Sequence, residues 1–131
     1  MSTRAISILG AIAKWTGRVL ALLLAVFWGM FFAEHLSEWF LNSNGHYPPA
    51  WVWRQQVFHF LIIVGLGIML RWDRLGTVVT LLATVGFFAL IPNWQWGGRG
   101  WFMPFINLIP VALFAVYWRT RAAIRPREGV A

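Results

Sequence analysis

Four long apolar segments constrain this chain more than any other feature of its sequence. They cover residues 17–41, 51–70, 75–91 and 102–118. Each approaches the roughly 20 apolar residues that a helix needs to cross a hydrocarbon layer about 30 Å thick. A spanning segment must satisfy its backbone hydrogen bonds internally, and the alternation of β-barrel strands is absent. The sequence therefore predicts an all-α polytopic membrane protein, a single domain of four transmembrane helices in an up-down bundle.

The composition agrees with a membrane protein and narrows the possible chemistry. Hydrophobic residues make up 60% of the chain and charged residues 11%, whereas about a quarter of the residues of a soluble domain are charged. There is no cysteine, which excludes disulfides, thiolate metal sites and cysteine nucleophiles. The motifs of serine hydrolases, phosphate-binding loops and dinucleotide folds are also missing. We therefore expect a protein that is not an enzyme and has no catalytic residues.

The basic residues predict the orientation in the membrane. The chain has 11 Lys and Arg against 4 Asp and Glu, a net charge of +7. Nine basic residues fall on one side of the predicted bundle: Arg4, Lys14, Arg18, Arg71, Arg74, Arg119, Arg121, Arg125 and Arg127. Only Arg54 and Arg99 lie toward the other side. The positive-inside rule then places both termini in the cytoplasm of a bacterial-type inner membrane, and explains the charge without nucleic acid as a partner.

The two ends of the chain and the loops refine this topology. Residues 1–16 form a basic amphipathic segment, which either lies flat on the cytoplasmic leaflet or extends the first helix. Residues 119–131 form a basic tail that favours an anionic leaflet. Asp73, in the short turn between the second and third helices, is placed to cap the third helix. Six tryptophans surround the two non-cytoplasmic loops, as a membrane-interface belt requires: Trp39, Trp51, Trp53, Trp94, Trp96 and Trp101.

One polar constellation interrupts the apolar segments. At 100° per residue, one side of the first helix carries Glu34, His35 and Glu38, and a comparable side of the second carries Gln55, Gln56 and His59. At 1.5 Å per residue, His35 lies about 9 Å and His59 about 12 Å from the intervening loop. Arg54 lies off this face but level with Glu38. The sequence predicts a polar pocket between the first two helices, open toward the non-cytoplasmic side.

This pocket has several possible roles. His35 and His59 could both ligate a haem, or one could hold the magnesium of a bacteriochlorophyll. A histidine beside carboxylates could instead bind a quinone carbonyl or relay protons. In each case the supporting residues would be Glu34, Glu38, Arg54, Gln55 and Gln56. Zinc would need a tighter ligand spacing than this one, so no metal site is predicted.

The favoured interpretation of the same residues is purely structural. A glutamate one turn from a helix end can reach the interface or pair with Arg54, and a histidine there can bond a backbone carbonyl.

Small residues on the third helix indicate close helix packing. Gly76, Thr80 and Thr84 recur every four residues, which lets another backbone approach. This small-residue face and the small size of the chain favour a non-enzymatic accessory or assembly subunit that packs against larger membrane proteins. A respiratory or photosynthetic complex would be a natural host. Binding of haem, pigment or quinone is the alternative function. A small proton-coupled transporter that depends on Glu34 is the third.

The segment "GIMLRWDRLGTVVTLLATVGFF" (67–88) carries a resemblance. An apolar helix, a basic-Trp-acidic turn and a glycine that opens the next helix resemble small uncharacterised bacterial four-helix inner-membrane proteins. The resemblance implies the four-helix topology, and it implies no particular activity or cofactor.

Overall fold

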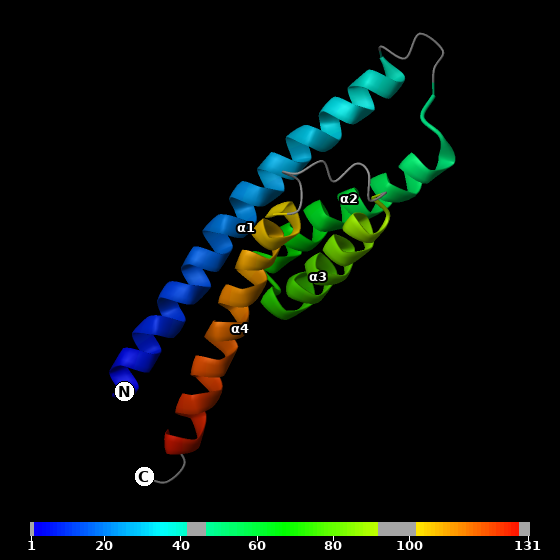
Figure 1. Cartoon of the computed structure of the whole chain (residues 1–131). Coiled ribbons are helices and arrows are strands. Elements are labelled where there is room, and N and C mark those ends of the chain that lie inside the picture. Colours follow the sequence, from blue (N-terminus) through cyan, green and yellow to red (C-terminus); the bar gives the residue numbers. More distant parts are fainter. Residues whose placement is uncertain (1, 42–46, 92–101, 129–131) are drawn as a thin grey trace.

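The described part of the chain contains four helices and no strand. The computed structural model describes residues 2–41, 47–91 and 102–128, with side chains as far as Ile124. It contains α1 (Thr3–Phe40), α2 (Ala50–Met69), α3 (Asp73–Ala89) and α4 (Met103–Glu128). Each helix packs against the next one in sequence, and α1 also packs against α4, so that the four form a bundle (Figure 1). The predicted all-α class is confirmed.

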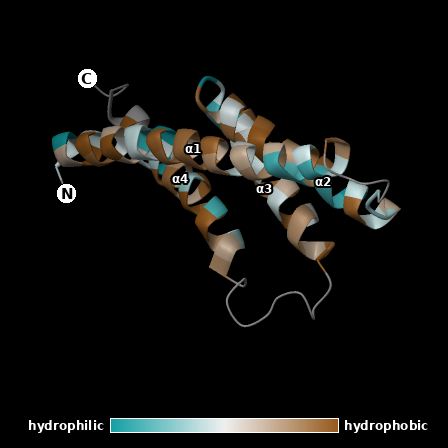
Figure 2. Ribbon diagram, turned by 90° about the horizontal axis from the view of Figure 1, so that it is seen from above, coloured by the Kyte–Doolittle hydropathy of each residue, from teal (hydrophilic) through white to brown (hydrophobic). Residues whose placement is uncertain are grey.

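Three of the four helices are suited to span a membrane. By length and apolar composition, α1, α2 and α4 are candidate spans. Hydrophobic residues run along all four helices (Figure 2), and large apolar side chains such as Leu23, Met30 and Leu82 are exposed, as lipid-facing positions are. α3 has 17 residues, or about 26 Å at 1.5 Å per residue. The chain is thus a candidate membrane protein with three spans, and the crossing by α3 stays a prediction.

Two helices are longer than the sequence indicated. α1 begins at Thr3, where the Ser2 side chain accepts a hydrogen bond from the Ala5 backbone N–H at 3.3 Å. Residues 3–16 therefore extend the first helix, one of the two alternatives. α4 continues to Glu128 and passes through Pro110 without a break, so residues 119–128 of the expected tail are helical.

The unequal lengths leave a pair of helices projecting at each end of the bundle (Figure 1). At one end, Trp118 of α4 bonds Asp73 at the start of α3, and α1 and α4 continue past this level. We call residues 3–16 and 119–128 the α1–α4 extension. At the other end, Phe87 near the end of α3 contacts Trp28, with ring centroids 5.8 Å apart. Beyond it α1 and α2 continue as the α1–α2 extension, residues 32–40 and 50–57.

Small residues bring α2 and α3 into close contact. A methyl group added at Gly65 would lie 2.6 Å from Thr80 Oγ1 and 2.7 Å from its backbone nitrogen, and one at Gly76 would meet the Met69 backbone. Gly76, Thr80 and Thr84 are all buried. The small-residue face of α3 thus packs against α2 of the same chain and is not free for another protein.

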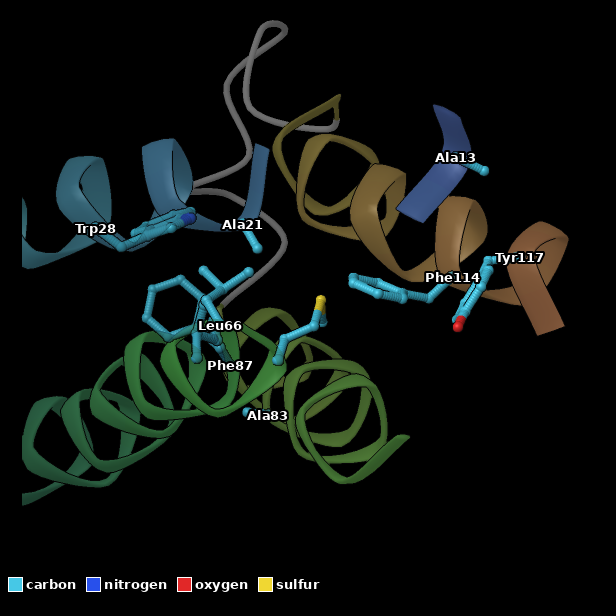
Figure 3. Close-up of a cluster of buried hydrophobic side chains, with 10 residues drawn as sticks. Ala13, Ala21, Trp28, Leu66, Ala83, Phe87, Phe114 and Tyr117 are labelled. Carbon is cyan, nitrogen blue, oxygen red and sulfur yellow. The ribbon is translucent and has the colours of Figure 1, made fainter. Parts of the chain in front are cut away.

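A second small-residue face, on α1, packs against α4. Gly10, Ala13, Gly17 and Ala21 are its buried residues, and a methyl group at Gly17 would lie 3.2 Å from the Phe114 ring. Figure 3 shows the resulting core in two parts, with Phe114 and Tyr117 near Ala13, and Trp28 above Leu66 and Phe87. In the α1–α4 contact, small residues of α1 therefore face aromatic rings of α4.

Candidate ligand-binding pocket

A pocket of about 390 Å³ lies between α1 and α2 at the base of the α1–α2 extension. Its walls are largely aromatic: Trp28, Phe31, Trp39, Trp51 and Phe87. Its polar lining consists of His35, Gln55, Gln56 and His59. The pocket therefore brings His35 of α1 together with Gln55, Gln56 and His59 of α2.

His59 is held rigidly at the inner end of this pocket. Its side chain is only 2% exposed. Nε2 lies 3.1 Å from the backbone carbonyl oxygen of Trp28, and Nδ1 lies 3.2 Å from Gln56 Oε1. The rings of Trp28, Phe32 and Phe87 surround the imidazole, with centroids 5.1, 5.4 and 5.4 Å away. Both ring nitrogens of His59 are thus engaged within the protein.

The hydrogen bonds of His59 define its tautomer. The Trp28 carbonyl can only accept, so Nε2 carries a proton and donates. In a neutral ring Nδ1 is then an acceptor, and the Gln56 side-chain amide must present its NH₂ group to it. A doubly protonated ring could donate to Gln56 Oε1, but it would place a charge among aromatic rings at high cost. We therefore assign a neutral His59 that links α1 to α2.

His35 occupies the outer part of the pocket and is less constrained. Its Nδ1 lies 2.7 Å from the Phe31 carbonyl oxygen, one turn earlier in α1, and donates to it. Its ring makes an edge contact with Trp39, at 5.6 Å between centroids. Within the described residues, Nε2 has no hydrogen-bond partner. A neutral His35 with its proton on Nδ1 therefore offers an acceptor at Nε2, and a protonated ring offers a donor.

Three of the seven predicted site residues do not line the pocket. Glu34, Glu38 and Arg54 have exposed side chains. Among the described residues, no ion pair joins Glu38 to Arg54. Helix rotation explains the difference, because the pocket is lined by the α1 positions Trp28, Phe31, His35 and Trp39. These residues recur every three or four positions, and Glu34 and Glu38 fall beside that stripe.

Asn107 of α4 is a buried polar residue that the sequence analysis missed. Its side chain is fully buried, and its Oδ1 accepts a hydrogen bond from Trp28 Nε1 at 2.7 Å. Its Nδ2 is buried without a partner among the described residues. Hydrogen bonds thus run from Asn107 through Trp28 to His59 and Gln56. A single asparagine within the apolar run "FINLIPVALF" was the available signal.

Several other sequence predictions lie outside the described residues. They include the loop tryptophans Trp94, Trp96 and Trp101, as well as Arg99 and the side chains of Arg125 and Arg127. Within the described residues, no group of three or more His, Asp or Glu side chains could hold a metal ion.

Comparison with known proteins does not assign the chain to a family. No family model matches it, and no curated protein or solved structure is significantly similar. The pocket geometry is therefore the basis for the functional argument.

Proposed function

We propose that this chain is a non-enzymatic integral membrane protein that binds a planar, carbonyl-bearing ligand of the quinone class in the α1–α2 pocket. The observation that carries the proposal is the unpartnered Nε2 of His35 beside aromatic walls. A quinone ring needs flat apolar surfaces for stacking and a few donors aimed at its carbonyl oxygens. The Gln55 amide is the candidate donor to a carbonyl oxygen, and Nε2 of a neutral His35 can accept from the hydroxyl group of the reduced, quinol form.

The engagement of His59 favours a quinone over a haem. A haem with two histidine ligands needs one free nitrogen from each ring. His59 uses Nε2 for the Trp28 carbonyl and Nδ1 for Gln56, so ligation would break the link between α1 and α2. Recognition of a quinone or quinol by His35 and Gln55 leaves that link intact.

The position of the pocket suits a ligand that arrives through the bilayer. The pocket is lined by Trp39 and Trp51, and Trp53 packs on Trp39 with ring centroids 5.3 Å apart. Tryptophan clusters of this kind settle at the headgroup level of a membrane. A lipid-dissolved quinone could therefore enter between α1 and α2 from the membrane side.

Titration with a water-soluble short-chain quinone in its reduced, quinol form tests the proposal. The purified chain in mild detergent should show saturable quenching of tryptophan fluorescence. His35→Leu and Gln55→Leu should each weaken binding about tenfold, the loss of one hydrogen bond of about 1.4 kcal/mol. Arg54→Gln is the matched control, because its side chain is exposed outside the pocket. Quenching that rises linearly with quinol and is equal in all variants would contradict the proposal. If the purified chain instead showed a Soret absorption band that both His35→Leu and His59→Leu abolished, the ligand would be a haem.

An accessory-subunit function is the second candidate, and the exposed carboxylates of α1 favour it. Glu34 and Glu38 are exposed, do not line the pocket and have no ion-pair partner in the described part of the chain. Phe31 and Phe40 are exposed beside them, at 43% and 61%. Such an acidic and aromatic edge suits a larger membrane protein with basic residues. Co-purification from native membranes should then be lost in Glu34→Gln/Glu38→Gln and kept in His35→Leu.

A further inference from the structure

A groove of about 410 Å³ separates α1 from α4 in the α1–α4 extension, at the end of the molecule opposite the aromatic pocket. α1 contributes Ser7, Gly10 and Lys14, and α4 contributes Tyr117, Thr120 and Arg121. Gly10 is buried where α1 touches α4, since a methyl group there would lie 2.5 Å from Thr120 Oγ1, and the exposed Ala11 lines the groove beside this contact. The groove is thus bounded by two cations, one on each helix.

Both cations converge on the same aromatic ring. Lys14 Nζ lies 5.3 Å and Arg121 Cζ 5.7 Å from the centroid of the Tyr117 ring. The ring attracts each cation, but the two cations repel each other. Neither has an acidic partner among the described residues. An anion bound in the groove that both residues line would therefore offset positive charge that no ion pair among the described residues neutralises.

One acidic residue lies nearby, and both of its oxygens are engaged elsewhere. Asp73 lines a neighbouring pocket together with Arg74, Trp118 and Arg121, but within the described residues it forms no ion pair with Arg121. Its Oδ1 accepts from the Arg74 backbone N–H at 3.0 Å, and its Oδ2 accepts from Trp118 Nε1 at 3.3 Å. The two other acidic residues with described side chains, Glu34 and Glu38, are at the opposite end of α1.

We propose that this groove binds the phosphate group of an anionic phospholipid, between Lys14 and Arg121. Arginine and lysine are the usual phosphate ligands, because they combine positive charge with several N–H donors. The Ser7 hydroxyl is a further donor in the groove. The Thr120 hydroxyl is not available, since it donates to the Tyr117 carbonyl at 2.7 Å.

The apolar surroundings of the groove favour a lipid as the source of the phosphate. Trp15 lines the groove and is 62% exposed, and Ile12 beside it is 58% exposed. Acyl chains attached to a bound phosphodiester could cover these side chains, whereas inorganic phosphate could not. The groove therefore provides cations for the phosphate of a lipid and apolar side chains for its acyl chains.

Native mass spectrometry of the purified chain in a neutral detergent tests this proposal. Short-chain phosphatidylglycerol, short-chain phosphatidylcholine and inorganic phosphate serve as separate probes. We expect phosphatidylglycerol to bind tightest and Lys14→Gln/Arg121→Gln to weaken it roughly tenfold or more. Ala11→Phe should also weaken it, because this change fills the groove without altering the charge.

A charge-matched control separates the groove from general electrostatic attraction. Arg4→Gln/Arg119→Gln removes two exposed arginines from the same end of the molecule but leaves the groove lining intact. At 0.15 M salt, where charges are screened over about 8 Å, this control should change binding less than threefold. Equal losses in both double variants, or no effect of Ala11→Phe, would overturn the proposal. Equal affinity for inorganic phosphate would assign the groove to free phosphate, and overturn the lipid assignment.

Discussion

At the residue scale, the buried hydrogen bonds around Trp28 connect three helices. Its indole N–H donates to Asn107 of α4, and its carbonyl accepts from His59 of α2. Asn107 and His59 are 0% and 2% exposed. In a membrane, a polar group that loses such a partner has no water to replace it. The three residues therefore fix how α1 is rotated against α2 and α4.

The Trp28–Asn107 bond should be measurable by a double-mutant cycle. Asn107→Leu leaves the indole N–H unpaired and should lower the free energy of unfolding by about 1–3 kcal/mol. Trp28→Phe removes the donor and also some packing. The double variant Trp28→Phe/Asn107→Leu should lose less free energy of unfolding than the two single variants added together, by roughly 0.5–1.5 kcal/mol. Unfolding in detergent with increasing sodium dodecyl sulfate would measure these values, and strict additivity would show that the bond contributes nothing.

At the scale of helices, the α2–α3 contact depends on two glycines. Gly65→Ala and Gly76→Ala would push new methyl groups against the backbone of the facing helix. We expect each to lower the free energy of unfolding by about 1–3 kcal/mol, the usual cost of overpacking. Gly67→Ala is the matched control on α2, because nothing lies within 4 Å of its added methyl group. It should be neutral or slightly stabilising, and equal losses at Gly65 and Gly67 would refute the close approach.

Asp73 joins the α2–α3 turn to α4. Its two carboxylate oxygens accept from the Arg74 backbone and from the Trp118 indole. Asp73→Ala should lower the free energy of unfolding by roughly 1–2 kcal/mol, and Asp73→Asn should lower it less, because one oxygen remains to accept. The same detergent unfolding measures both. If the losses in free energy of unfolding caused by Trp118→Phe and Asp73→Ala were fully additive in the double variant, the hydrogen bond between the turn and α4 would not contribute to stability.

The sequence predicted the elements better than their contacts. Apolar length predicts all four helices, but it predicts an end at 118 for the fourth, because basic residues interrupt the apolar run there. Helical periodicity put Glu34, His35 and Glu38 on one side, yet only His35 reaches the pocket. Rotation about a helix axis is set by packing. Here the small residues of α1 and the Trp28–Asn107 bond determine it, and neither was recognised in the sequence.

At the scale of the whole molecule, charge separates toward the two ends of the bundle. One end carries most of the basic residues with described side chains: Arg4, Lys14, Arg18, Arg71, Arg74, Arg119 and Arg121. The other end carries Glu34, Glu38 and Arg54. In the predicted orientation, which stays a prediction, the basic end and both termini face the cytoplasm.

The crossing of the membrane by α3 is the prediction that decides the topology. At about 26 Å, α3 is slightly shorter than the hydrocarbon layer, a mismatch that local thinning of the bilayer can accommodate. The natural chain has no cysteine, so single cysteines can be introduced at Arg71 and Leu90, just outside the two ends of α3, with Ser2 and Tyr47 as references.

In intact cells, a membrane-impermeant maleimide should label Tyr47→Cys and Leu90→Cys. It should label Ser2→Cys and Arg71→Cys only after the membrane is opened. Labelling of Ser2→Cys but not Tyr47→Cys would reverse the orientation. If Leu90→Cys were protected together with Arg71→Cys while Tyr47→Cys reacted, both ends of α3 would lie on the cytoplasmic side, and α3 would not be a span. The close packing of α3 along α2 through Gly65 and Thr80 argues against that result, because a helix antiparallel to a spanning neighbour must share its depth in the membrane.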